Sequence, residues 1–215
     1  MTSSAPPPEA VRVAVFAKAP VAGTVKTRLT HLLGPDGAAG LHAGLVRHAL
    51  ATAAQARVGT VELWCSPDET HPFFERCARE FGARLKRQRG ANLGERMRHA
   101  IESGRAEGST IILIGSDCPA LTGAHLDAAA AALSSHEVVI IPAEDGGYVL
   151  VGMSASVPAI FDAIPWGTAA VMAETRQRLG HAGVLWKELP ALWDVDRPED
   201  YARLQREGLL REVLS

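Results

Sequence analysis

The sequence predicts an α/β protein with a three-layer α/β/α arrangement around a mostly parallel, mixed sheet. Stretches rich in β-branched residues alternate with helix-type patterns along the chain, and such alternation is typical of parallel strands joined by crossover helices. The run TIILI at residues 110–114 has the composition of a central parallel strand. The chain has 215 residues, of which 47% are hydrophobic, so it can bury one large core.

Each expected element rests on a local signal. Asp36, Thr70, Asn92 and Thr122 are side chains that cap helix starts, and two adjacent glycines between apolar runs predict one antiparallel strand pair. The expected strands cover residues 11–16, 61–65, 83–86, 110–114, 138–141, 148–153 and 184–189. The expected helices cover residues 25–33, 36–57, 70–81, 92–104, 124–133, 168–179 and 198–210.

Composition limits the classes of function. We expect a disordered tail at residues 1–10 and one domain over residues 11–215, because the segment MTSSAPPPEA lacks the apolar core of a signal peptide. A formal net charge of −2 does not indicate broad attraction to nucleic acid or to a membrane surface. The three cysteines have no C-x-x-C spacing, which argues against a disulfide framework and a structural zinc site. No apolar run reaches the roughly 18 residues of a transmembrane helix, so we expect a cytoplasmic enzyme.

The stretch at residues 11–29, VRVAVFAKAPVAGTVKTRL, is the most informative for function. It has the pattern of a buried strand, a Gly/Pro loop and a basic helix start, which is how α/β proteins hold a phosphate. A Walker A motif requires Gly directly before Lys, whereas Val25 precedes Lys26. A dinucleotide motif is absent because Gly23 stands alone. The alternative is a tight turn with solvated cations, but Lys18, Lys26 and Arg28 are more cations than a turn needs.

Acidic residues supply a candidate metal site. Asp117 follows the strand at residues 110–114, where the carboxyl ends of parallel strands form a ligand crevice. Mg²⁺ bound to polyphosphate takes one or two carboxylates, although an aspartate here also suits an Asx-turn. Asp194 and Asp196 point the same way if their segment is extended, so either is a candidate second ligand. Glu199 and Asp200 suit the start of the last helix.

Three other segments contain candidate ligand-binding residues. Gly146 and Gly147 permit close backbone approach and Asp145 suits a sugar hydroxyl or an acceptor, with a plain hairpin turn as the alternative. Asn92 opens a helix that can reach a nucleotide, and an ordinary N-cap explains it equally well. Trp166 suits an acceptor pocket, although a buried structural Trp is the simpler interpretation.

Four segments occur in one order, at residues 16–29, 115–121, 142–148 and 194–200. Together they resemble the DUF2064 family of transferases, which implies the Rossmann-like nucleotide-diphospho-sugar transferase fold called glycosyltransferase A (GT-A), over roughly residues 11–210. The KTRL segment is similar to that of phospholactate guanylyltransferases. The DVDRPED segment resembles the ending of sugar-acid cytidylyltransferases, and the metal-binding aspartate there corresponds to Asp196. KAPVAG replaces the Leu-Ala-Gly-Gly run of the molybdenum-cofactor guanylyltransferases.

This resemblance and the charged residues predict a metal-dependent transferase that binds a nucleotide. The leading hypothesis is nucleotidyl transfer to a phosphorylated small molecule with release of pyrophosphate. The alternatives are glycosyl transfer from a nucleotide-diphospho sugar, or a non-catalytic nucleotide-binding module. The expected cofactor is Mg²⁺ or Mn²⁺, the expected partners are a nucleotide and a small-molecule acceptor, and a homodimer is left open. The expected residues are, for catalysis, Lys26, Arg28 and Asp117; for the nucleotide, Lys18, Pro20, Gly23, Thr27, Asn92 and Ser116; for metal, Asp117, Asp194 and Asp196; for the acceptor, Asp145, Gly146, Gly147, Tyr148 and Trp166.

Overall fold

A seven-stranded sheet with the order β3-β2-β1-β4-β6-β5-β7 runs through the part of the chain that the computed structural model describes, residues 10–214. The strands are β1 (Ala10–Lys18), β2 (Thr60–Ser66), β3 (Arg84–Arg87), β4 (Ser109–Gly115), β5 (Val138–Pro142), β6 (Tyr148–Met153) and β7 (Trp186–Glu188). Only β6 runs antiparallel to its neighbours β4 and β5, and the other pairs are parallel. The predicted mixed sheet is therefore confirmed.

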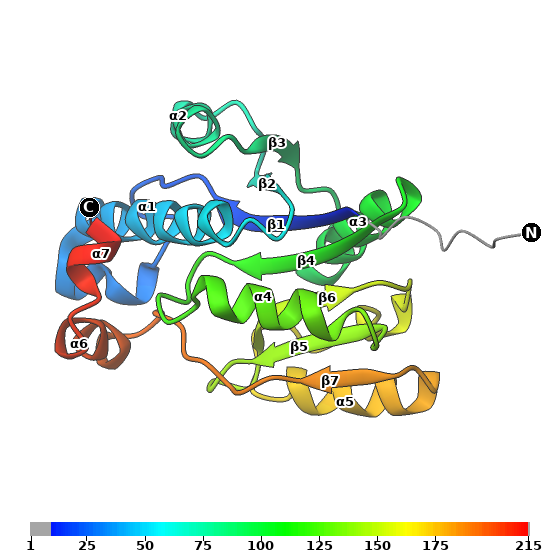
Figure 1. Cartoon of the computed structure of the whole chain (residues 1–215). Helices are drawn as coiled ribbons and strands as arrows, with labels where there is room; N and C mark the ends of the chain where they lie inside the picture. The colour runs from blue at the N-terminus through cyan, green and yellow to red at the C-terminus, as the bar shows by residue number, and fades with distance from the viewer. Residues whose placement is uncertain (1–9, 215) are drawn as a thin grey trace, which may run out of the picture.

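Helices cover both faces of this sheet and complete the three layers (Figure 1). One face carries α1 (Thr30–Ala56), α2 (Pro72–Phe81) and α4 (Gly123–Ala132), and the other carries α3 (Leu93–Ala106) and α5 (Val171–Ala182). Two short helices, α6 (Pro198–Arg206) and α7 (Leu210–Leu214), end the described chain beside α1. Short 3-10 turns η1 (Thr27–Leu29) and η2 (Pro158–Ile160) lie in the connections.

The adjacent parallel strands β1 and β4 contribute side chains to the apolar core on both faces of the sheet. In β1, Val13 and Val15 point into one apolar cluster, whereas Ala14 and Phe16 point into the other, as the two-residue period of a strand requires. A third cluster joins α1 to the segment before α6 and contains the fully buried Val195. This cluster fixes the C-terminal segment at the edge where β1 and β4 end.

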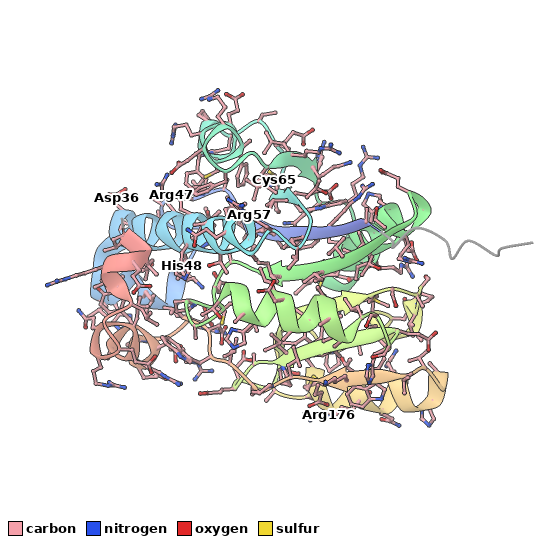
Figure 2. All side chains as sticks on the ribbon, in the orientation of Figure 1. Asp36, Arg47, His48, Arg57, Cys65 and Arg176 are labelled. Atoms are coloured by element: carbon pink, nitrogen blue, oxygen red, sulfur yellow. The ribbon has the colours of Figure 1, made fainter. Side chains whose placement is uncertain are left out.

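Several predicted boundaries were wrong, mostly at glycines. The expected helix over residues 25–33 is instead the turn η1 followed directly by α1. Asp36 does not cap a helix, because it lies inside α1 just after an interruption at Gly34 (φ 70°, ψ 166°) (Figure 2). The last expected helix is two helices, α6 and α7, separated by a turn in which Gly208 has φ 76°.

Other corrections concern helix starts and the tail. His71, not Thr70, caps α2, because its Nδ1 accepts a hydrogen bond from the backbone N–H of Phe73 at 3.3 Å. The helix expected from residue 168 begins at Val171. Ala10 already belongs to β1, which corrects the end of the expected tail, and residues 1–9 of that prediction lie outside the described residues.

Candidate functional site

A cleft lies where β1 and β4 end. Phe16 of β1 is paired with Gly115 of β4, so the loops that follow these two strands begin side by side. The cleft has two connected cavities, a larger one of about 550 Å³ and a smaller one of about 260 Å³. Leu93, Gly115 and Asp117 line both cavities, so Asp117 stands at their junction.

Lys26 and Asp117 form the central contact of the cleft. Lys26 precedes η1 in a left-handed conformation (φ 47°, ψ 40°), which is rare for a residue with a side chain. Its Nζ lies 2.9 Å from Asp117 Oδ1 and donates to the backbone carbonyl of Val195 at 2.6 Å. The N–H of Val195 in turn donates to the carbonyl of Asp117 at 2.9 Å. Three segments that are distant in sequence therefore meet at one ammonium group.

Asp117 is ionised and still opens to the cleft. Burial opposes ionisation, but the nearby charge of Lys26 and its hydrogen bond outweigh it and hold the pKa of Asp117 below its ordinary value. The Asp117 side chain keeps 43% of its exposure, whereas that of Lys26 keeps 4%. One carboxylate oxygen is thus engaged by Lys26 while the group as a whole remains accessible from the cavity.

His42 of α1 lies beside this carboxylate. Its Nε2 lies 3.1 Å from the carbonyl oxygen of Lys18, so Nε2 carries the proton. Its Nδ1 lies 3.8 Å from Asp117 Oδ1 and has no hydrogen-bond partner among the described residues. Burial lowers the pKa of His42 despite the attraction of Asp117, which favours a neutral ring at neutral pH.

A second ion pair joins Arg28 to Asp196 in the larger cavity. Both side chains are exposed, so the pair is open to exchange with a bound ion. Val195 between the two aspartates is fully buried, while Asp194 and Asp196 each line a cavity. This is the alternation expected for an extended segment.

Three carboxylates line the smaller cavity: Asp117, Asp145 and Asp194. Burial, together with the negative charges of Asp145 and Asp117, raises the pKa of Asp194 to about 6 against the opposing effect of Lys26. The Oδ1 of Asp145 accepts a hydrogen bond from the N–H of Gly147 at 2.9 Å. Crowded carboxylates of this kind are stabilised by a cation.

No group of three or more His, Cys, Asp or Glu side chains within residues 10–214 is arranged as a complete protein-only metal site. This agrees with the way Mg²⁺ binds, through one or two carboxylates with substrate phosphates and waters completing the shell. Asp117 with Asp194 or Asp196 therefore fits such an ion chemically.

The remaining predicted residues divide into two groups. Lys18, Thr27 and Ser116 line the larger cavity, and Gly147, Tyr148 and Trp166 line the smaller one. Pro20, Gly23, Asn92 and Gly146 line neither cavity. The Asn92 side chain is used as the cap of α3, because its Oδ1 accepts from the N–H of Glu95 at 3.0 Å. Gly146 has φ 95°, and a Cβ there would lie 2.4 Å from the carbonyl oxygen of Ala169.

Sequence reasoning missed His42 and Gln88, which line the larger cavity, whereas Leu93 and Arg96 of the same cavity belong to the helix start that was expected to reach a nucleotide. Gln88 follows β3 and its Nε2 donates to the carbonyls of Ala17 at 3.3 Å and Trp64 at 2.8 Å. No short motif marks these residues. Their only sequence signal is their position after an expected strand or near an expected helix start.

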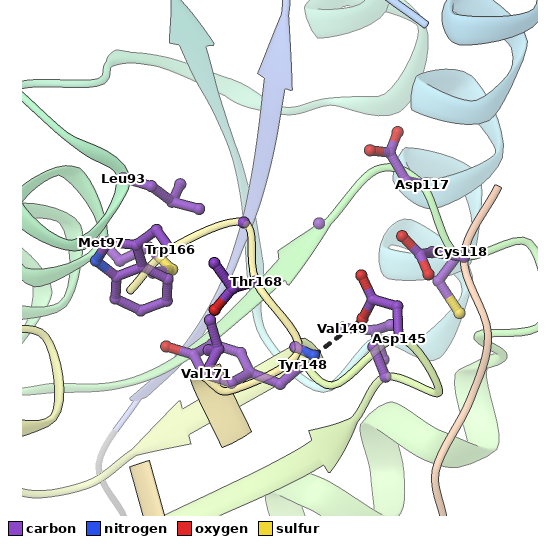
Figure 3. A pocket seen from close by; sticks show the side chains of 15 residues that line it. Leu93, Met97, Asp117, Cys118, Asp145, Tyr148, Val149, Trp166, Thr168 and Val171 are labelled. Carbon is purple, nitrogen blue, oxygen red and sulfur yellow. Dashed lines mark hydrogen bonds between the residues drawn. The ribbon is translucent and has the colours of Figure 1, made fainter. Parts of the chain in front are cut away.

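The smaller cavity has an acidic side and an apolar side. Figure 3 shows Leu93, Met97 and Trp166 together on one side and Asp117 and Asp145 on the other. Trp166 meets Tyr148 edge to face, with 6.0 Å between ring centroids and 86° between the ring planes. The cavity is therefore suited to a ligand with one charged end and a less polar body.

Comparisons with known proteins agree with this geometry. The model of the family "Uncharacterized protein conserved in bacteria (DUF2064)" matches residues 49–168. The 3-phospho-D-glycerate guanylyltransferase of Phenylobacterium zucineum (strain HLK1) is 32% identical over 197 residues, covering 90% of this chain and 82% of that protein.

Solved structures give the same picture of the fold. One from Desulfovibrio desulfuricans G20, which carries the name of a nucleotide-diphospho-sugar transferase, has a TM-score of 0.81 and 29% identity, covering 95% of this chain and 98% of that chain. A cytidylyltransferase from Leptospira borgpetersenii has a TM-score of 0.61 and 15% identity, covering 92% and 85%. The latter likeness concerns the fold alone, and the predicted nucleotide-diphospho-sugar transferase fold is confirmed.

None of the helices in residues 10–214 has the length and apolar character needed to span a bilayer. The family match covers more than half of the chain, and the curated relative aligns with nearly all of it. With the cleft and the fold in agreement, the chain belongs to the DUF2064 family.

Proposed function

We propose that this protein is a metal-dependent nucleotidyltransferase that joins a nucleoside monophosphate to a phosphorylated small acid and releases pyrophosphate. The observation that carries the proposal is the alternation of cations and carboxylates along one cleft, Lys26 with Asp117 and Arg28 with Asp196. The activity of the guanylyltransferase relative supports nucleotidyl transfer and suggests a guanine nucleotide and a phosphoglycerate-like acceptor for this chain.

The two ion pairs are arranged for exchange with a metal–triphosphate complex. A nucleoside triphosphate brings about four negative charges, and a divalent cation offsets two of them. With such a complex bound, Lys26 and Arg28 would contact phosphate oxygens in place of the carboxylates, and Asp117 and Asp196 would be available to hold the cation. Each lost ion pair is replaced by a charge-assisted contact of similar strength, so the exchange leaves no charge unpaired.

The residues that would hold the metal are Asp117 with Asp194 or Asp196. When bound, the ion supplies charge neutralisation at the phosphate oxygens and alignment of donor with acceptor. Asp194 suits this role because its carboxylate lies among other acids, and their charges outweigh the attraction of Lys26.

The smaller cavity is proposed to hold the acceptor. No Lys, Arg or His lines it, so an anionic acceptor depends there on backbone groups. The N–H groups of Gly167, Thr168 and Ala169 donate to nothing among the described residues. Gly167 and Thr168 line this cavity, and an unpaired backbone N–H is a donor that an anion can satisfy.

The transfer itself is a displacement at phosphorus. A phosphate oxygen of the acceptor attacks the α-phosphorus, the bond from that phosphorus to the α–β bridging oxygen breaks, and pyrophosphate leaves. No covalent nucleophile on the protein is needed, only positioning and charge stabilisation. Cys118 lines the acceptor cavity, but burial raises its pKa to about 12, so it stays a thiol and takes no part.

A thermal-shift screen tests the proposal. Nucleoside triphosphates and nucleotide-diphospho sugars are added one at a time, each with and without Mn²⁺. A ligand present at 100 times its Kd stabilises the native state by about 2.7 kcal/mol. A triphosphate that raises the melting temperature only with metal supports the proposal. A response to sugar nucleotides alone favours glycosyl transfer, and no response to any nucleotide contradicts both.

A further inference from the structure

We propose that Trp166 sets the size of acceptor that the smaller cavity admits, and that Gly94 makes this position of the indole possible. The inference rests on the proposed function, because it concerns the acceptor of that same reaction. It goes further by naming the residue that limits the acceptor and the class it favours, namely short phosphorylated acids.

Trp166 closes the apolar side of the cavity. Together with Leu93 and Met97 it faces the acids across the cavity (Figure 3). A ligand whose phosphate would be held beside Asp117 and Asp194 by the proposed metal ion extends toward the indole. The length of its carbon skeleton is therefore limited by where the indole stands.

The indole stands there because Gly94, the second residue of α3, has no side chain. A Cβ on Gly94 would lie 2.5 Å from Trp166 Nε1, 2.9 Å from its Cε2 and 2.6 Å from the carbonyl oxygen of Phe161. Gly94 is not in the left-handed region, so its role is to leave space rather than to permit a turn. A methyl group at this position pushes the indole away from α3.

Trp166 is carried by a loop rather than by a core element. Its N–H donates to the carbonyl of Ile164 at 2.8 Å, and the next residue, Gly167, turns the chain with φ 80°. Most side chains of residues 162–170 are exposed. Removing the indole therefore enlarges the cavity without removing a strand or a helix from the fold.

Tyr148 lies against the indole and adds a second consequence. Its hydroxyl is buried without a hydrogen-bond partner among the described residues, and Figure 3 shows its ring directed toward Trp166, away from Asp145. An unpaired buried hydroxyl is costly. In a variant without the indole, this hydroxyl becomes available to the far end of a longer, polar acceptor.

The magnitude follows from the way apolar pockets discriminate by size. One methylene group changes kcat/KM by roughly 10- to 200-fold when a pocket wall opposes it. We therefore expect the wild-type protein to favour two- and three-carbon acids over a six-carbon acid by at least about tenfold. We expect Trp166→Ala to reduce that preference by about tenfold or more.

The experiment uses phosphoglycolate, 3-phosphoglycerate, 4-phosphoerythronate and 6-phosphogluconate as acceptors, with GTP and Mn²⁺. Both kcat/KM for pyrophosphate release and Kd for each acid, by calorimetry, are measured for the full chain. Trp166→Ala and the milder Trp166→Phe, which enlarge the cavity, are compared with Gly94→Ala, which keeps the indole but displaces it. Trp186→Phe is the matched control, because that half-buried Trp on β7 lines neither cavity.

A shifted size ranking in the Trp166 and Gly94 variants, with Trp186→Phe unchanged, supports the inference. Adding Tyr148→Phe to Trp166→Ala is expected to remove the gain for the longest acid. If folded Trp166→Phe and Trp166→Ala rank the acids by size as the wild type does, the inference is overturned. If the Kd values of the wild type rank the acids by size but no nucleotide is transferred to any of them, only the proposed function is contradicted. The ranking of Kd values then still supports the role of Trp166.

Discussion

Replacement of Lys26 by methionine tests the centre of the cleft. Lys26→Met keeps the unbranched apolar stem that fills the space beside η1 and removes only the ammonium group. That group contacts Asp117 at 2.9 Å and the carbonyl of Val195 at 2.6 Å. The substitution therefore affects both the free protein and the proposed contact with a nucleotide phosphate.

The cost in the free protein can be bounded. Removing one partner of a fully buried ion pair costs about 3–5 kcal/mol. Asp117 keeps 43% of its side-chain exposure, so water rehydrates the abandoned carboxylate, and we expect a smaller loss of about 1–2 kcal/mol. The lost contact with a phosphate is worth about 1.5–3 kcal/mol, which corresponds to a rise in Kd of roughly 10- to 150-fold.

Urea denaturation measures the first quantity and titration calorimetry with GTP and Mn²⁺ measures the second. Lys187→Met on β7 is a matched control, because that exposed lysine is remote from both cavities. The reasoning is refuted if Lys26→Met folds with wild-type stability and binds the nucleotide with wild-type affinity. A stability loss with unchanged nucleotide affinity assigns Lys26 to structure alone.

Three further predictions concern other parts of the site and the fold. Because the folded-state pKa of Asp194 is about 6, above an unfolded value near 3.9, the stability of the native state falls as pH rises from about 3.9 to 6 and does not change further above 6. Without metal, Asp194→Asn should thus be about 1–2 kcal/mol more stable than wild type in urea melts above pH 7 and equal to it below pH 4; a constant difference across pH contradicts this. Arg28→Gln should strengthen the binding of Mn²⁺ in the absence of nucleotide, as measured by electron paramagnetic resonance, and should weaken GTP binding. If Mn²⁺ binds more weakly instead, Asp196 is not a metal ligand. Gly44→Ala places a Cβ 2.3 Å from the carbonyl oxygen of Val213 and should cost about 1–3 kcal/mol of stability, visible as a lower melting temperature without change in nucleotide affinity.

The layered fold could be predicted because strands and helices have different apolar periods. TIILI is buried along its whole length in β4, and the glycine pair before Tyr148 does join two antiparallel strands. Helix boundaries were less predictable where one backbone angle decides them. The expected break between residues 33 and 36 is present as the interruption at Gly34, whereas the turn at Gly208, with φ 76°, was not expected.

The charged residues of the site were also predictable, because cations after β1 and an aspartate after β4 fall at the same edge of a parallel sheet. The contacts between these charged residues were not predictable. Lys26 was expected beside phosphate, whereas in the free protein it holds Asp117 and the carbonyl of Val195. His42 and Gln88 were missed because they reach the cleft through tertiary packing, which no local pattern encodes.

The central claim is that the cleft transfers a nucleotide rather than a sugar. The most direct measurement is product analysis by ³¹P nuclear magnetic resonance after incubation with GTP, 3-phosphoglycerate and Mn²⁺. The account predicts pyrophosphate in equal amount to a new product whose two phosphorus atoms are joined through a bridging oxygen. Absence of both products from a protein that binds GTP, together with release of a nucleoside diphosphate from a nucleotide-diphospho sugar, would contradict it.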